Sequence, residues 1–363
     1  MALRLGTAAA IAAAAAGCSE KSATEQAQAT VAAVEGMNAV PASADVILGA
    51  EVGPLARSAL IERAVAGMLT ADPGLRGELE KLFAGCGFDP VRDLSTVLLA
   101  MDNPGEGTSS DRTLMVATGK LTEGKLAACV GKHMSQMGGT LVERAVNGRV
   151  HYQADAPPGR LDVWFAFGSP QTLVVSSSAE FLAEALGKGP RLASDGLMAQ
   201  LIHRAHAPDA AVWAAGRVPV AVGKGLASAT SGQVGPPRAM FGHLAADTGL
   251  TVELGVEMES PEQAKAALSL ATNQLRLLAQ VAQKWRLGRA MAKVTTETVG
   301  ATLFVRAKLT DEELRQALAP IDRDAGPDQN PAPPEPDQGA QPHGQGDASP
   351  GGQAPLRKQG QAD

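Results

Sequence analysis

The chain has 363 residues, a formal charge of −6 and 19% charged residues. This length is enough to bury one large core or two medium ones. An acidic chain lacks the excess of Lys and Arg with which nucleic-acid-binding proteins neutralise phosphates, so we expect no nucleic-acid partner. Aromatic residues are only 3% of the chain, and six His and three Cys are too few for a scaffold with several metals or many disulfides.

The N-terminus has the order of a secretory signal. One cation, Arg4, precedes a short apolar run from Leu5 to Ala16, and Gly17 and Cys18 follow. This run is shorter than the roughly 18–20 apolar residues that span a bilayer. We therefore predict an exported chain whose leader, residues 1–17, is removed.

The tetrapeptide Ala15-Ala16-Gly17-Cys18 resembles the lipobox of bacterial lipoproteins, although Ala15 stands where that family most often has Leu. The resemblance implies that the signal is cut before Cys18 and that Cys18 carries the lipid. Ser19, rather than an acidic residue, follows the Cys, which by the same resemblance favours the outer membrane. The expected location is the cell envelope, as an outer-membrane lipoprotein that faces the periplasm or the surface. The alternative is an ordinary cleaved signal peptide with an incidental Cys.

Residues 18–40 are rich in Ser, Glu, Gln, Thr and Ala, and we expect a flexible tether. The first strand is expected at 44–51, and helices are expected to follow it before a buried strand at 94–101. Residues 323–363, at the other end, are rich in Pro, Gly and Gln. Such a segment cannot bury enough apolar surface to offset its chain entropy, so we expect a disordered tail.

A strand–helix–hairpin order then occurs twice. The first copy has a strand at 113–119, a helix at 123–137 and a hairpin whose tip, Asn147-Gly148, strongly favours a tight turn. The second copy has a strand at 250–257, a helix at 261–287 and a hairpin at 292–308. Hairpins outnumber crossovers, which predicts an α+β fold.

We predict two similar lobes, residues 41–190 and 191–322, each an antiparallel sheet with helices packed on one face. This layout resembles two-lobed α+β domains of unknown function in secreted bacterial envelope proteins. No motif in the resemblance assigns a role to a residue.

Two cysteines remain if Cys18 carries lipid. Cys86 and Cys129 are an even pair in an oxidising compartment, where a disulfide can form. Two buried free thiols are the alternative, because Cys also packs as a small hydrophobe. The sequence does not place the two residues side by side, and both readings stay open.

Catalytic and metal-binding motifs are weak. The nucleophile elbow G-x-S-x-G does not occur, and Gly216–Gly225 lacks the spacing of a phosphate-binding loop and is expected to be a glycine loop. His203 and His206, three residues apart near a helix end, are weak candidates for metal ligands. A cationic last turn at the negative end of the helix dipole explains them more simply. We predict no metal and no cofactor.

The helix at 261–287 is the most patterned surface. Leu277 and Val281 lie beside its apolar seam and widen it, which favours packing on the protein's own sheet. The alternative is a helix that docks a partner or lines an apolar cavity between the lobes. The seam alternates steps of four and three residues and comprises Ala264, Leu268, Ala271, Leu275, Leu278, Ala282 and Trp285.

Three functions fit these observations. The leading hypothesis is a non-catalytic, lipid-anchored envelope protein whose partners are the membrane, through its lipid, and an unidentified envelope protein that it binds or scaffolds. The second is a carrier of an apolar ligand in a cleft between the lobes, since aliphatic clefts suit such ligands. The third is a hydrolase whose site is assembled from residues distant in sequence.

Overall fold

The computed structural model describes residues 32–314 except 73, 75, 78–79, 81–84, 103–111, 156–161, 231, 247–248 and 285–287. The expected signal peptide, residues 1–17, lies outside this part of the chain, and so do Cys18 and the expected tail, 323–363. Of the expected tether, 18–40, only the segment from Ala32 onward is described.

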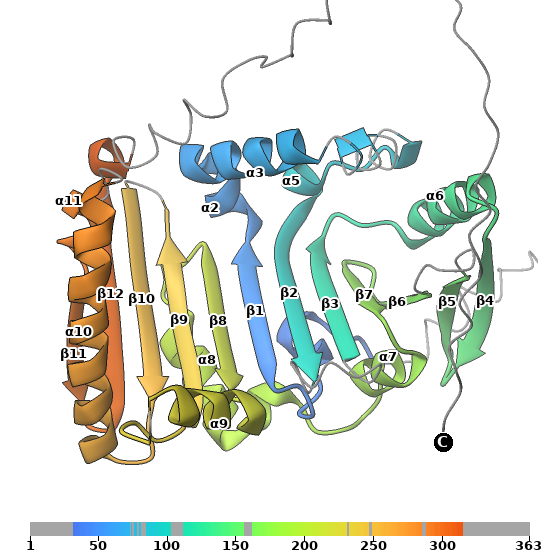
Figure 1. Ribbon diagram of the computed structural model, residues 1–363. Coiled ribbons are helices and arrows are strands. Elements are labelled where there is room, and N and C mark those ends of the chain that lie inside the picture. Colours follow the sequence, from blue (N-terminus) through green and yellow to red (C-terminus); the bar gives the residue numbers. More distant parts are fainter. Residues whose placement is uncertain are drawn as a thin grey trace, which may run out of the picture. The chain divides into compact units, whose positions relative to one another are not determined.

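Twelve strands form one antiparallel sheet, in the order β11-β12-β10-β9-β8-β1-β2-β3-β7-β6-β5-β4 (Figure 1). The helices occur between these strands, which confirms the α+β class. The strands are β1 (Val46–Glu51), β2 (Leu94–Asp102), β3 (Arg112–Gly119), β4 (Thr140–Val146), β5 (Arg149–Asp155), β6 (Val163–Ser169), β7 (Thr172–Ser176), β8 (Val212–Arg217), β9 (Ala239–Ala245), β10 (Gly249–Glu257), β11 (Thr295–Val299) and β12 (Thr302–Thr310).

Turn and cap residues explain several element boundaries. Asn147 and Gly148, with φ of 51° and 79°, turn β4 into β5, and both residue types tolerate this left-handed region. The side chain of Ser260 accepts a hydrogen bond from the backbone N–H of Gln263, which caps the start of the long helix α10 (Pro261–Lys284). The hairpin predicted at Asn147-Gly148 and the predicted start of the helix at residue 261 are confirmed.

The division into two lobes is not confirmed. Strand β1 of the first half pairs directly with β8 of the second, from Val46 opposite Gly216 to Ala50 opposite Val212. The largest apolar core also includes residues from both halves, so the halves share one sheet and one core.

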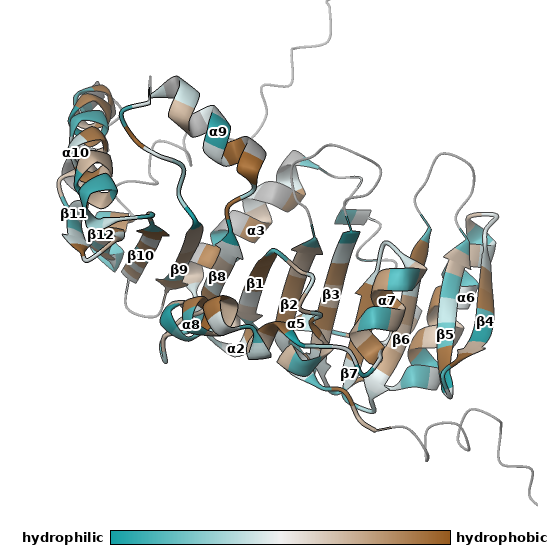
Figure 2. Ribbon diagram, turned by 90° about the horizontal axis from the view of Figure 1, so that it is seen from below, coloured by the Kyte–Doolittle hydropathy of each residue, from teal (hydrophilic) through white to brown (hydrophobic). Residues whose placement is uncertain are grey.

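Helices lie on both faces of the sheet, so the expectation of helices on one face is wrong. Neighbouring residues of a strand point to opposite faces. On β7, Val174 joins the core under α7 (Ala179–Leu186) and α8 (Gly196–Ala205), whereas Leu173 joins the core under α6 (Glu123–Gln136). Figure 2 shows α8 on one side of the sheet and α10 on the other.

The remaining helices are short or lie at the ends of the strands. In Figure 1, α3 lies along the upper ends of the central strands and α9 along their lower ends. These elements are η1 (Gly36–Ala39), α2 (Val52–Arg57), α3 (Ala59–Ala71), α5 (Pro90–Asp93), η2 (Leu192–Ser194), α9 (Val220–Ala229) and α11 (Gly288–Met291). Within the described ranges, no helix combines the length and the apolar character needed to cross a membrane.

The folded part begins before residue 40, so the expected tether is too long at its C-terminal end. Val34, Ala39 and Val40 are buried in the main core. The buried guanidinium of Arg149 donates hydrogen bonds to the carbonyl oxygens of Phe167, Gly168 and Ala32. These contacts hold Ala32, at the start of the described chain, against the end of β6.

Candidate functional site: an open apolar face

One face of the central strands is apolar, and none of the described helices covers it. In Figure 1, no helix of the described part crosses the middle of β10, β9, β8, β1, β2 and β3 on the side toward the viewer. Side chains of alternate residues point to this side, which we call the open face. The strand register aligns them in two cross-strand rows that contain only apolar residues: Leu254, Gly242, Ala214, Leu48, Leu99 and Met115 in one, and Val252, Leu244, Val212, Ala50 and Val97 in the other. The second row ends at Ala117 of β3, which is buried in the core under α6.

Exposure separates this face from the opposite one. Ile47, Leu98 and Trp213, which point to the α8 side, are buried. On the open face, Leu48, Leu99 and Val212 are only half-buried. Antiparallel sheets with one face toward water usually carry polar residues on that face. An apolar face that stays half-exposed is typical of a binding surface.

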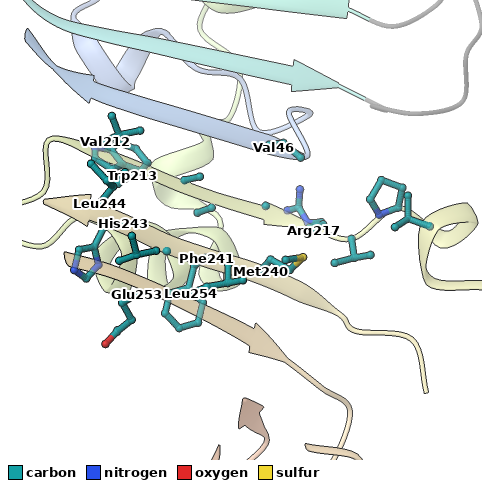
Figure 3. A pocket seen from close by; sticks show the side chains of 18 residues that line it. Val46, Val212, Trp213, Arg217, Met240, Phe241, His243, Leu244, Glu253 and Leu254 are labelled. Carbon is teal, nitrogen blue, oxygen red and sulfur yellow. The ribbon is translucent and has the colours of Figure 1, made fainter. Parts of the chain in front are cut away.

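A groove of about 490 Å³ lies on this face over β8, β9 and β10 and reaches Val46 of β1 (Figure 3). Ligand sites for small molecules commonly have volumes of about 300–1,000 Å³. The floor contains small residues, because Ala214 and Gly242 stand opposite each other in the register. Val222, near the start of α9, also lines the groove.

The groove offers few charges to a ligand. Arg217, His243 and Glu253 are the titratable residues among those that line it. Arg217 is paired with Asp195 at 2.9 Å and Glu253 with Arg306 at 2.5 Å. The lining therefore favours a molecule, or a part of one, that is apolar.

Exposed apolar side chains also lie on the helices around the open face. Val220 on α9 is 72% exposed, and Leu277, Leu278 and Val281 on α10 are each more than half exposed. The expectation that Leu278 packs in a buried seam is thus wrong, because only part of α10 rests on the sheet. Its packed side holds Ala264, Ala267 and Ala282.

One contact shows which way the exposed residues of α10 face. The hydroxyls of Thr272 on α10 and Thr296 on β11 lie 3.4 Å apart, so this side of the helix faces the outer strand β11. At about 3.6 residues per turn, Leu277, Leu278 and Val281 lie on the other flank, which faces the open face.

The structure does not bring a metal site together at His203 and His206. The Nε2 atom of His206 lies 3.8 Å from Oε1 of Glu51, and its ring lies beside that of Trp213. Among the described residues, no three His, Cys, Asp or Glu side chains gather as metal ligands would. A third ligand for this pair is therefore not found there.

Cys86 and Cys129 form a disulfide, with their Cα atoms 5.2 Å apart. Cys129 belongs to α6, and Cys86 precedes α5 in the segment that connects β1 to β2. The bond fastens this connection to the helix that borders the first half of the sheet.

Buried titratable groups lie on β5, away from the groove. Burial lowers the pKa of His151, and the positive charge of Arg149 lowers it further. Burial also raises the pKa of Tyr152, whose hydroxyl donates to Glu123 at 3.0 Å. His151 stands opposite Ala166, a residue of the main core, so it points away from the open face. These groups belong to the packing of the first half.

Two elements at the groove were missed in the sequence. The expected glycine loop, Gly216–Gly225, is the end of β8 and the start of α9. Strand β9 was not expected, because Gly242 and His243 interrupt its apolar residues. The sequence does contain a signal for this strand, because its alternate residues Met240, Gly242 and Leu244 share one face.

Comparisons with known proteins assign no family. No family model matches the chain, and no curated protein matches it. One solved structure, described as "Structure of crystal form I of TP0453", is similar at a TM-score of 0.40 and 12% identity, over 81% of this chain and 99% of that chain. A likeness this distant assigns neither a function nor a residue role.

Proposed function

We propose that this chain is a lipid-anchored protein of the bacterial cell envelope that binds an apolar molecule on the open face of its sheet. The proposal rests on one observation: a groove lined mainly by aliphatic residues lies on a half-exposed sheet face. The groove lies on a continuous sheet rather than in a cleft between lobes. Binding, rather than catalysis, is what this lining supports.

The binding energy would come from burial of apolar surface. Each Å² of apolar surface removed from water contributes roughly 25 cal/mol. A ligand on the groove floor would cover Ala214, Leu244 and Leu254 from above. The rows continue beyond the groove to Leu99 and Met115, so a longer apolar molecule would gain further contact.

Attachment through Cys18 is the second part of the proposal and rests on the lipobox-like tetrapeptide. Each buried CH₂ group contributes about 0.8 kcal/mol, so two or three acyl chains hold a protein firmly on a bilayer. Feeding the source cells a palmitate analogue tests this. We expect label in the wild-type chain and none in Cys18→Ser, and an unlabelled wild-type chain would refute the anchor.

A fluorescence titration tests the groove. The chain from residue 18 onward, with Cys18→Ser and both ends retained, is titrated with 1-N-phenylnaphthylamine, a neutral apolar dye. We expect saturable binding with enhanced emission. Ala214→Phe should weaken binding at least tenfold, because the added ring fills the centre of the floor.

Ala145→Phe is the matched control, since Ala145 is an exposed strand residue on β4 at the far end of the sheet. It should bind the dye like the parent chain. The proposed binding function is wrong if the dye does not saturate, or if Ala214→Phe binds as tightly as the control.

A further inference from the structure

We propose that the apolar ligand is a single straight hydrocarbon chain of about 16 carbons, which lies in the groove parallel to β8 and β9 and whose headgroup is not contacted. This ligand class rests on the proposed function and narrows it. Two features of the described residues carry it: the shape of the groove, and the direction in which its charged side chains point.

The groove is long and follows the strands. On β8 its lining runs without interruption from Val212 to Pro219, whereas on β10 it includes only the residues from Val252 to Leu254. Val212 and Val218 are six residues apart, which is about 20 Å of extended chain. A straight carbon chain advances about 1.25 Å per carbon, because its bonds are about 1.5 Å long and meet at about 111°. The groove therefore has the length of about 16 carbons.

The groove is also narrow. Gly216 stands between Val46 of β1 and Met240 of β9, whose Cα atoms are two strand spacings, or about 10 Å, apart (Figure 3). A Cβ at Gly216 would lie 2.9 Å from Cγ2 of Val46, so this side chain leans over the floor. Spread over about 20 Å, the volume of about 490 Å³ gives a mean width of about 5 Å. Non-bonded carbons pack about 3.5–4.0 Å apart, so one file of carbons fits and methyl branches do not.

The charged residues of the lining point away from the open face. Arg217 is paired with Asp195, the N-cap residue of α8, and thus points to the α8 side. Glu253 stands opposite His243, which in turn stands opposite Trp213 of the main core, so both side chains point to the α8 side as well. Over its described lining the groove therefore presents no charge to a ligand on the open face. Charge complementarity favours an uncharged chain there, and a headgroup of any charge would stay in water.

A series of chain lengths tests the length of the groove. The chain from residue 18 onward, with Cys18→Ser and both ends retained, is titrated with alkylphosphocholines from octyl to octadecyl, each below its micelle concentration. Competition with 1-N-phenylnaphthylamine reports their affinity. Each CH₂ group that enters the groove should raise the affinity about two- to fourfold, because the groove covers it only in part. We expect the affinity to rise up to the hexadecyl chain and to level off at octadecyl.

Palmitate and phytanate test the width. They share the backbone length and the carboxylate, but phytanate carries methyl branches and is the more apolar of the two. Hydrophobicity alone would therefore favour phytanate, whereas the groove should bind it about tenfold more weakly, because the branches overfill it.

Three headgroups of different charge test the remaining part. One charge at a lipid headgroup typically changes the affinity about fivefold when a protein cation contacts it. Palmitate, hexadecylphosphocholine and hexadecyltrimethylammonium should differ by less than this at physiological salt, where long-range effects of the acidic chain are screened. Tighter binding of palmitate would indicate a site for a free fatty acid, and tighter binding of the phosphocholine a site for a lipid headgroup. Either result would contradict binding through the hydrocarbon chain alone.

Val222→Trp tests the end of the groove beside α9. Val222 lines the groove and is 55% exposed, so the larger side chain can be accommodated without disrupting the core. The affinity of this variant should level off at a shorter chain than that of the parent. Val220→Trp is the matched control, because Val220 is 72% exposed on the same helix and is not part of the groove lining. It should keep the length profile of the parent.

Several outcomes would overturn this ligand class and leave the proposed function standing, provided that the dye still binds saturably. These are equal competition by phytanate and palmitate, an affinity that levels off at decyl or keeps rising at octadecyl, and the same length profile for Val222→Trp and Val220→Trp. Absence of saturable dye binding would instead contradict the proposed function itself.

Discussion

The indole of Trp213 lies directly on Gly49, its partner across the pairing of β1 with β8. A Cβ atom at position 49 would lie 2.1 Å from Cε2 of Trp213, closer than any two carbons pack. The contact occurs where the two halves of the chain join into one sheet. Glycine is thus required at this position by a close approach, and not by its backbone angles.

Gly49→Ala should therefore weaken the junction. The indole must move within a closely packed core, and overpacking of this kind typically costs about 1–3 kcal/mol. Urea unfolding should show a free energy of unfolding that is lower by that amount, and therefore a lower midpoint. Gly67→Ala is the control, because a Cβ at Gly67 meets no atom within 4 Å and Ala favours the helix α3. If the two variants unfold at the same urea concentration, the contact does not constrain the junction.

Reduction of the disulfide between Cys86 and Cys129 should lower stability. The two residues are 43 positions apart, and in the chain-entropy model a loop of this length contributes about 4 kcal/mol. The measurement is urea unfolding of Cys18→Ser with and without a reductant. A thiol count on the denatured, unreduced chain should find no reactive thiol, and two reactive thiols would exclude the bond.

His151 should make stability depend on pH. Its pKa is lowered in the folded chain, chiefly by burial, so near pH 6.5 the unfolded chain binds more protons than the folded one. The stability that this neutral imidazole contributes is full above the unfolded pKa of about 6.5 and is lost as the pH falls below it. Between pH 7.5 and 5.5, wild type should lose more unfolding free energy than His151→Gln. Equal losses would show that His151 does not titrate on unfolding.

Local signals predicted much of the fold. Asn147-Gly148 specifies a hairpin through its own backbone preferences, and the capped start of α10 is specified by Ser260 and Pro261. These features depend on residues that are neighbours in sequence. They could therefore be read without knowing which strands pair.

The open face could not be read in this way. Leu48 and Ala214 share a row only because β1 pairs with β8, far away in sequence, and alternation alone does not say which face a helix will cover. Both faces of these strands are apolar, so the pattern resembles that of a strand buried on both sides. The prediction that Leu278 is buried was wrong for a related reason. An apolar seam predicts which side of a helix packs, but not how much of the helix length lies on the sheet.

Helix α9 should be the least stable wall of the groove. It has the same length as α8, 10 residues, and both flank β8 in sequence. Met198, Leu201 and Ala205 anchor α8 in the main core, whereas α9 exposes Val220 and contains glycines that weaken a helix by about 1 kcal/mol each.

Hydrogen exchange followed by mass spectrometry measures this difference. Amides of α9 should exchange faster than those of α8 in the free chain, because opening α9 exposes little additional apolar surface. Since Val222 lines the groove, a bound apolar molecule would contact α9 and should slow its exchange while that of α8 stays unchanged. Gly225→Ala, whose Cβ meets no atom within 4 Å, should also slow exchange without a ligand. If a saturating apolar dye leaves the exchange of α9 unaltered, the ligand does not lie against this helix.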